Sequence, residues 1–190
     1  MKKKFRILVD LDDTLTNLIQ VWVEKINQKF DTNVKFEDIA DWDIAKFFPS
    51  VPKQDIFKVL SDKSIWNEVT PLAYSQEYLQ KLKDDGHEIL IVSASHYKDI
   101  QDKYEKIIQK YFPFIDWKDV VVTSRKELIQ GDILIDDAIH NVEMSNHRYK
   151  FLMDCSHNQE FDCNKNKTLR VYNWVEIYDI ISYLSVIDSR

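Results

Sequence analysis

The sequence is short of glycine, cysteine and basic charge. Its 190 residues include two glycines, Gly86 and Gly131. No glycine-rich phosphate loop is therefore present, which excludes P-loop and dinucleotide-binding functions. The net charge of −6 argues against a nucleic acid polymer as partner, because nucleic-acid binders are typically basic. The two cysteines, Cys155 and Cys163, lack zinc-like partners, so we interpret them as reduced thiols without a disulfide framework.

Long apolar runs are also missing. No stretch approaches the ~20 apolar residues of a membrane span, so we expect no membrane association. The basic start, Lys2 to Lys4, is followed by an apolar stretch too short for a signal peptide. We therefore expect a cytoplasmic protein. The hydrophobic fraction of 44% is ample for a folded core, which argues against disorder.

Three carboxylates follow the first apolar run of the chain. Residues Phe5 to Val9 have the length and β-branched content of a buried strand, and Asp10, Asp12 and Asp13 come directly after it. Polar residues at the carboxyl end of a buried strand lie where open α/β sheets bind ligands. Like charges packed this densely favour a bound cation. Taken alone, the stretch fits an acidic helix N-cap equally well.

The rest of the chain alternates between strand and helix patterns. We predict strands at residues 5–9, 88–92, 120–122, 133–135 and 149–153, and helices at about 15–30, 75–85, 97–111 and 177–184. This order predicts a doubly wound, Rossmann-like α/β fold with a mostly parallel five-stranded sheet. Residues 15–70 hold aromatics, two prolines and short helical pieces, which indicates a small helical cap inserted after the first strand. The α/β core would then comprise residues 1–14 and 71–190.

Polar side chains follow four of the predicted strands. They are Asp10 with Asp12, then Ser93, Lys126, and Asp136 with Asp137. In a parallel sheet these strand ends share one edge, so the residues can converge. A carboxylate can attack phosphorus, magnesium would neutralise the anions, and an ammonium and a hydroxyl would hold phosphoryl oxygens. Each residue alone has an ordinary explanation as a turn, solvated or capping residue, but together they favour a phosphoryl-transfer site.

These residues resemble the four motifs of the haloacid dehalogenase (HAD) superfamily. The matching segments are Asp10-Leu11-Asp12-Asp13-Thr14-Leu15, Ser93, Lys126 and Asp136-Asp137. Within the superfamily, the chain is most similar to the 5'(3')-deoxyribonucleotidases of the cytosolic and mitochondrial type. Segments 64–72, 151–159 and 172–174 also look similar, so the resemblance covers nearly the whole chain. It implies a HAD-type fold and a phosphomonoesterase for deoxyribonucleoside 5'-monophosphates, with 3'-monophosphates left open.

The resemblance also implies catalytic and metal-binding roles. Asp10 would be the nucleophile that becomes phosphorylated. Asp12 would protonate the leaving oxygen and then activate water. Mg²⁺ would be held by Asp10, the backbone carbonyl of Asp12 and the acidic pair, through Asp136 or Asp137. Asp13 stands where the family usually has glycine, and we expect its side chain to cap the following helix and point away from the metal.

Substrate contacts follow from the same resemblance. Ser93 and Lys126 would bind phosphate. The residues expected to border the rest of the substrate are Leu18, Trp42, Trp66, Ala94, Ser95 and His96. Leu18 replaces a family aromatic and Ala94 a hydroxyl residue, so one ring and one polar contact are missing. Packing in the cap core would explain Trp42 and Trp66 nearly as well as base stacking does.

Three other functions remain open from the sequence. A phosphatase for another small metabolite, such as a sugar phosphate, would use the same motifs. A receiver-like phosphoacceptor domain also uses carboxylates, a hydroxyl and a lysine, but its phosphoacceptor follows a middle strand, whereas Asp10 follows the first. A 3'-phosphatase for nucleic acid ends is disfavoured by the acidic net charge. We expect a small-molecule nucleoside monophosphate as partner and leave a homodimer open.

Overall fold

A six-stranded sheet organises the structure, a computed structural model that describes residues 2–189. Its strands are β1 Arg6–Val9, β2 Glu88–Ser93, β3 Val120–Val122, β4 Ile133–Asp136, β5 Tyr149–Met153 and β6 Leu169–Val171. They are ordered β3-β2-β1-β4-β5-β6, and every neighbouring pair is parallel. The Rossmann-like α/β prediction is confirmed. The expected number of five strands was wrong, because β6 is short and carries a polar residue at its centre.

Both faces of the sheet are buried, which explains the apolar character of its central strands. Successive side chains of a strand point to opposite faces. Ile7 and Val9 of β1 accordingly belong to the larger core, while Leu8 belongs to a second core with Leu134 and Val142. Val142 comes from helix α6, Ile139–Met144. These two cores fix the sheet and thus the position of its carboxyl edge.

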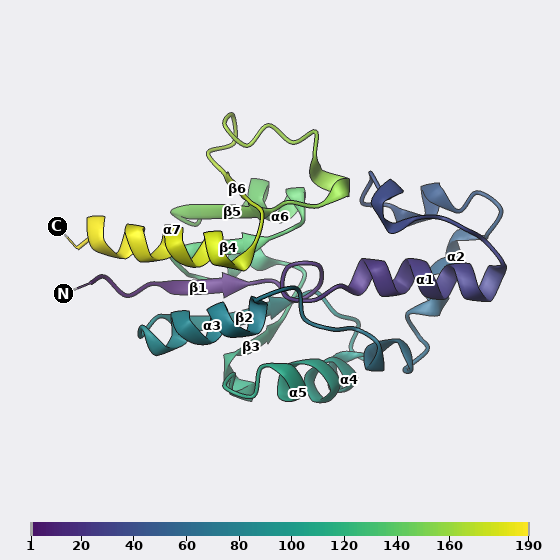
Figure 1. Cartoon of the computed structure of the whole chain (residues 1–190), viewed down its shortest axis with the longest axis horizontal. Helices are drawn as coiled ribbons and strands as arrows, with labels where there is room; N and C mark the ends of the chain where they lie inside the picture. Colours follow the sequence, from purple (N-terminus) through teal and green to yellow (C-terminus); the bar gives the residue numbers. More distant parts are fainter. Residues whose placement is uncertain (1, 190) are drawn as a thin grey trace.

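The helices cover the sheet and extend past its carboxyl edge. The α-helices are α1 Leu18–Phe30, α2 Lys53–Val59, α3 Ser75–Asp84, α4 Ile100–Lys103, α5 Gln109–Tyr111, α6 and α7 Trp174–Ile187. Helices α3 and α7 lie together on one face (Figure 1). A π-helical turn, Tyr104–Ile108, joins α4 to α5. Short 3₁₀ turns lie at 36–38, 44–47, 65–67, 117–119, 126–128 and 156–158. Within residues 2–189, none of the helices is long and apolar enough to cross a membrane.

Residues 15–70 contain α1, α2 and three of the 3₁₀ turns, and helices α1 and α2 lie beyond the arrowheads of the strands (Figure 1). Helix α1 begins at Leu18 rather than at the predicted Leu15. The preceding residues turn back on the loop after β1, where Thr16 Oγ1 donates to the carbonyl of Leu11 at 3.1 Å. The Trp22 indole ties α1 to α2 by donating to the carbonyl of Ile56 at 3.0 Å. That this segment acts as a separate cap stays a prediction.

Candidate active site

The loop after β1 is held by the neighbouring strand and by α7. The amide of Asp10 donates to the carbonyl of Ile135 at 2.9 Å, so the bonding between β1 and β4 continues past the end of β1. The buried Trp174 indole donates to the carbonyl of Thr14 at 2.9 Å. Asp13 has a left-handed backbone, with φ of 55°, a conformation that aspartate tolerates better than most residues. Asp10 is therefore presented from a fixed turn.

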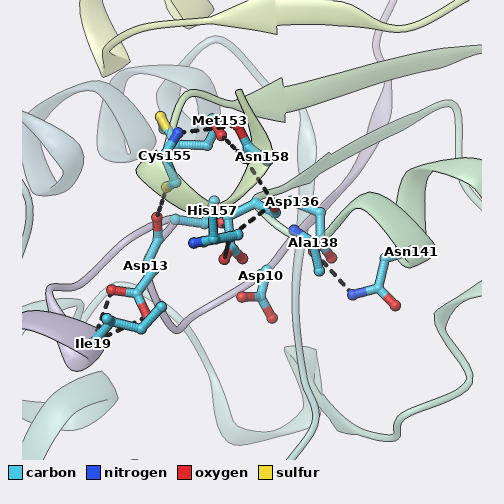
Figure 2. Close-up of polar contacts among 12 residues, drawn as sticks. Asp10, Asp13, Ile19, Asp136, Ala138, Asn141, Met153, Cys155, His157 and Asn158 are labelled. Atoms are coloured by element: carbon cyan, nitrogen blue, oxygen red, sulfur yellow. Dashed lines mark hydrogen bonds and ion pairs between the residues drawn. The ribbon is translucent and has the colours of Figure 1, made fainter. Parts of the chain in front are cut away.

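Asp13 caps the helix that follows it, as expected. Its Oδ1 accepts a hydrogen bond from the amide of Ile19, in the first turn of α1, at 2.9 Å. Figure 2 shows this carboxylate turned toward Ile19, apart from the Asp10 carboxylate. Burial and the nearby Asp137 raise the pKa of Asp13 well above its usual value, and the bond from Ile19 offsets only part of that rise.

Lys126 lies between two carboxylates at the carboxyl edge. Its 3₁₀ turn follows β3, and only 2% of the residue is exposed. The ammonium donates to Asp10 Oδ1 and to Asp136 Oδ2, the latter at 2.7 Å. Burial alone would lower the pKa of Lys126, but Asp10 and Asp136 reverse this effect and raise it. Lys126 is therefore a charged ammonium at neutral pH.

A compact acidic group lies beside this lysine. Carboxylate oxygens of Asp10, Asp136 and Asp137 lie within 4.8 Å of one another, and all three residues are buried. Burial raises the pKa of Asp10, Lys126 lowers it, and the other two carboxylates raise it further, so that the net shift is strongly upward. Burial likewise raises the pKa of Asp137. One lysine is not enough to offset this much buried negative charge.

The donor set of this group suits a hard divalent cation. Three carboxylates offer only oxygen ligands, which Mg²⁺ prefers. The raised pKa values of Asp10 and Asp137 mark a site at which a bound cation would be strongly favoured. Asp136 Oδ1 is already occupied, since it accepts from the amide of Ala138 and from Asn141 Nδ2, both at 2.9 Å. The residues therefore fit the predicted magnesium site.

A lysine that the sequence did not point to contacts both Asp12 and Ser93. Lys103, at the end of α4, donates to Asp12 Oδ2, and its Nζ lies 3.4 Å from Ser93 Oγ. Lys103 is 6% exposed and Ser93 3% exposed. The available signal was its spacing: Lys103 falls on the apolar face that includes Ile100 and Ile107, where a lysine needs a partner.

Asp137 is held in place by further residues that the sequence did not point to. His157 Nε2 lies 3.1 Å from Asp137 Oδ2, and Asn158 Nδ2 donates to the Asp137 carbonyl at 2.9 Å. Arg170 of β6 donates to Asn158 Oδ1 at 2.7 Å. Figure 2 shows His157 and Asn158 on the loop that passes this side of the site. The His157 contact would orient the Asp137 carboxylate toward a metal ion, and the Asn158 bond holds the backbone of Asp137.

Cys155 completes a group of mixed chemistry with these residues. Its sulfur, an Asp137 oxygen and a His157 nitrogen lie within 4.8 Å of one another. Burial and the neighbouring carboxylates raise the pKa of Cys155 strongly, so it stays a thiol at neutral pH. The thiol points to the carbonyl of Asp13 at 3.8 Å. Both cysteines are free, as expected.

A cavity of about 540 Å³ opens over the acidic group. Polar residues at its floor include Asp10, Asp12, Lys126, Asp136 and Asp137. Its apolar wall comes from residues 15–70 and consists of Leu18, Ile19, Trp22, Ile39, Ile44, Phe57 and Leu60. Asp41, Trp42, Asp43 and Lys53 of the same segment also line the cavity. This volume lies in the usual range of small-molecule sites, roughly 300–1,000 Å³. A charged floor and an apolar wall suit a ligand with one phosphate end and one flat organic end.

The predicted substrate-contacting residues do not all border this cavity. Leu18, Trp42 and Ala94 line it, and Trp42 is 57% exposed. Trp66 does not; it is 2% exposed and packs in the larger core. Ser93 and Ser95 line a separate cavity of about 150 Å³ together with Lys103. His96 is exposed and stacks near Tyr97, with ring centroids 4.4 Å apart.

Sequence comparison places this site in a known family. The profile described as "5' nucleotidase, deoxy (Pyrimidine), cytosolic type C protein" matches residues 3–187. The chain belongs to that 5'-nucleotidase family. It is 33% identical over 171 residues to the 5'(3')-deoxyribonucleotidase of Bacillus subtilis (strain 168), covering 90% of this chain and 95% of that protein. It is 32% identical over 168 residues to the 5'(3')-deoxyribonucleotidase of Clostridium acetobutylicum, covering 88% of this chain and 89% of that protein.

Solved structures agree on the fold of this 5'-nucleotidase family member. A HAD family hydrolase from Deinococcus radiodurans R1, with bound phosphate and sodium, superposes with a TM-score of 0.63 at 15% identity, covering 93% of this chain and 94% of that one. A haloacid dehalogenase-like protein from Agrobacterium tumefaciens gives a TM-score of 0.66 at 10% identity, covering 98% and 100%. The chain is therefore a HAD-type phosphatase of the deoxyribonucleotidase type, a hydrolase of phosphoric monoesters.

Proposed function

We propose that this enzyme is a Mg²⁺-dependent phosphomonoesterase that hydrolyses deoxyribonucleoside 5'-monophosphates, and 3'-monophosphates as a second substrate class, through an aspartyl-phosphate. The observation that carries the proposal is the position of buried Asp10. Its carboxylate contacts Lys126 and lies beside the acidic pair, and it lines a cavity that is also lined by apolar side chains of residues 15–70. The base of a nucleotide fits such a wall, and its phosphate fits the floor.

Asp10 would act as nucleophile in the first half of the reaction. Its carboxylate oxygen attacks phosphorus, the bond from phosphorus to the ester oxygen breaks, and Asp12 gives that oxygen a proton. Lys126, which lines the main cavity, and Ser93, which lines the smaller one beside Lys103, would hold phosphoryl oxygens and stabilise the charge that spreads over them. Bound Mg²⁺, held by Asp10, the Asp12 carbonyl and the acidic pair, would supply charge neutralisation between the phosphate and the carboxylates.

Water would release phosphate in the second half. Asp12, having lost its proton, removes one from a water molecule that attacks the phosphorus on Asp10. The bond from phosphorus to the Asp10 oxygen breaks, and free phosphate leaves. The apolar wall from residues 15–70 would limit the access of bulk water while the acyl phosphate exists. The relatives from Bacillus subtilis and Clostridium acetobutylicum, both 5'(3')-deoxyribonucleotidases, support the choice of substrate.

A panel of phosphate esters tests the substrate, and a labelling experiment tests the intermediate. We expect Mg²⁺-dependent, EDTA-sensitive hydrolysis that is fastest with deoxyribonucleoside monophosphates. Equal rates with sugar phosphates would overturn the nucleotide assignment in favour of a general metabolite phosphatase. Acid quenching with radiolabelled substrate should leave hydroxylamine-labile label on the protein, and Asp10→Asn should abolish it. A label that survives this substitution would exclude Asp10 as the nucleophile.

A further inference from the structure

Lys103 is a buried cation that the proposed mechanism does not use. Its side chain is 7% exposed, and lysines are seldom so buried unless they are paired. Its ammonium contacts two residues of the mechanism, the Asp12 carboxylate through Oδ2 and the Ser93 hydroxyl at 3.4 Å. No other strand end or loop of the site presents a lysine to Asp12 among residues 2–189.

The two oxygens of Asp12 differ sharply in their surroundings. Oδ2 is held by Lys103. Oδ1 is buried and has no hydrogen-bond partner within residues 2–189. Buried polar atoms in folded proteins nearly always have a partner, so an exception in a native site needs an explanation. Asp12 also lines the 540 Å³ cavity. Oδ1 is therefore the Asp12 oxygen that has no bond to give up before it exchanges a proton with a ligand.

The surroundings of Lys103 hold its side chain in place. Its Nζ lies 5.1 Å from the centre of the Trp66 ring, within the range of a cation–π contact. Trp66 is itself fixed in the core. The π-helical turn Tyr104–Ile108 follows Lys103 directly, and such turns are rare and concentrate at functional sites. Trp66 therefore lies next to the site through its contact with the Lys103 ammonium, although it does not line the cavity.

We propose that Lys103 is a positioning residue for Asp12. By binding Oδ2, it fixes the carboxyl group so that Oδ1 faces the leaving oxygen of the substrate. In the first half-reaction, the ester oxygen keeps the electron pair of the broken bond to phosphorus and takes the proton from Asp12 Oδ1. Asp12 is then an anion beside the Lys103 ammonium. This inference rests on the proposed function, since it assumes that Asp12 is the general acid.

The dependence of kcat/KM on the leaving group tests this role. A nucleoside leaves as an alkoxide that needs a proton, whereas p-nitrophenolate leaves without one. With kcat/KM, the comparison reports the first half-reaction only. We expect Lys103→Met to lose on the order of a hundredfold on a deoxyribonucleoside 5'-monophosphate, and less than about threefold on p-nitrophenyl phosphate. Lys103→Arg keeps the charge and should restore part of the loss.

Lys110→Met is the matched control, because Lys110 is exposed on the same helical stretch and contacts Tyr111 rather than the site. It should match the wild type on both substrates. In an Asp12→Asn background, Lys103→Met should cause no further loss, because a positioning residue acts only through the residue it positions. Equal losses of Lys103→Met on both substrates would overturn the proposal and make Lys103 a phosphate-binding or structural residue.

Two further outcomes distinguish a failure of the proposed function from a failure of the proposed role of Lys103. If the wild type hydrolyses no nucleotide, the proposed function fails; if it does and Lys103→Met behaves like it, only the role of Lys103 fails. Circular dichroism and thermal unfolding show whether the variants fold. Should Lys103→Met not fold, Lys103→Gln and Lys103→Arg supply the same comparison of leaving groups. An unchanged ratio between the two substrates in both of these variants would again reject the positioning role.

Discussion

The two edges of the central sheet differ in what their polar and charged side chains contact. At the amino edge, polar side chains bond the backbone where strands begin: His87 Nδ1 accepts from the amide of Phe5 at 3.1 Å, and Asp132 Oδ2 accepts from the amide of Arg6 at 2.8 Å. At the carboxyl edge, buried carboxylates gather, and burial raises the pKa of both Asp10 and Asp137.

The comparison shows which edge adds to the free energy of unfolding and which edge lowers it. Each bond at the amino edge satisfies a backbone donor that would otherwise be left without a partner. The carboxyl edge instead keeps like charges close together in a buried site, which costs stability in the absence of a cation. Strongly perturbed pKa values of this kind mark functional sites. One edge therefore stabilises the sheet, and the other gathers the charge that the proposed phosphoryl transfer would use.

The largest expected contrast in kcat and stability is between one variant at each edge, Asp10→Asn and Asp132→Ala. Asp10→Asn should lower kcat by about 10⁴-fold or more, because the amide is a poor nucleophile. Its free energy of unfolding in EDTA should not fall, since a buried charge is removed. Asp132→Ala should keep the wild-type kcat but lose about 1 kcal/mol of stability with the bond to Arg6. Steady-state kinetics and urea unfolding measure both effects.

The opposite pattern would contradict the comparison. A stable, active Asp132→Ala variant with unchanged unfolding would show that the amino-edge bonds contribute nothing. A marked loss of stability in Asp10→Asn would show that Asp10 supports the fold through Lys126 rather than burdening it. Mg²⁺ should raise the melting temperature of the wild type more than that of Asp10→Asn, because the variant loses one of the three carboxylate ligands.

Lys126→Met should have the next largest effect, because Lys126 is the cation that offsets the buried negative charge at the carboxyl edge. In EDTA, it leaves the carboxylates of Asp10 and Asp136 without their shared ammonium. Removing one partner of a buried ion pair costs about 3–5 kcal/mol. Loss of a charge that stabilises the transition state should lower kcat by about 10²–10³-fold. Urea unfolding with and without Mg²⁺ measures the stability, and bound Mg²⁺ should reduce the deficit.

Lys118→Met is the matched control for charge. Lys118 lies eight positions earlier in the chain, and its ion pair with Asp116 is largely exposed. Pairs of this kind contribute about 0–1 kcal/mol, so this variant should resemble the wild type. A deficit of Lys126→Met that is no larger than that of Lys118→Met would mean that the buried pairs are energetically neutral.

The carboxyl edge was more readable from the sequence than the residues around it. Apolar runs such as Phe5 to Val9 specify strands, and a polar residue after such a run must lie at the strand end, so Asp10 and Lys126 could be placed near each other. Lys103 could not, because its role depends on the direction in which one helical turn faces. Trp66 and Trp42 have the same side chain, and only the tertiary packing makes one buried and the other exposed. The short strand β6 had no such run to reveal it.

The smallest expected effect is a pH dependence of opposite sign at the two edges, measured without metal. Burial lowers the pKa of His87, so the stability it contributes is complete above the unfolded value of about 6.5 and is lost as the pH falls through the lower folded pKa. Asp10 behaves in the opposite way. Its folded pKa is raised, so its contribution is complete below the unfolded value of about 3.9 and is lost as the pH rises through the folded pKa.

Single variants separate these two trends in urea unfolding from about pH 7.5 to about pH 5.5. His87→Asn keeps an acceptor for the Phe5 amide but does not titrate, so its stability deficit relative to the wild type should shrink as the pH falls. Any stability advantage of Asp10→Asn should also shrink, because the wild-type carboxyl becomes neutral as it takes up a proton. Differences that stay constant with pH in both variants would mean that neither edge is linked to protons. A deficit of His87→Asn that grows on acidification would reverse the sign assigned to the amino edge.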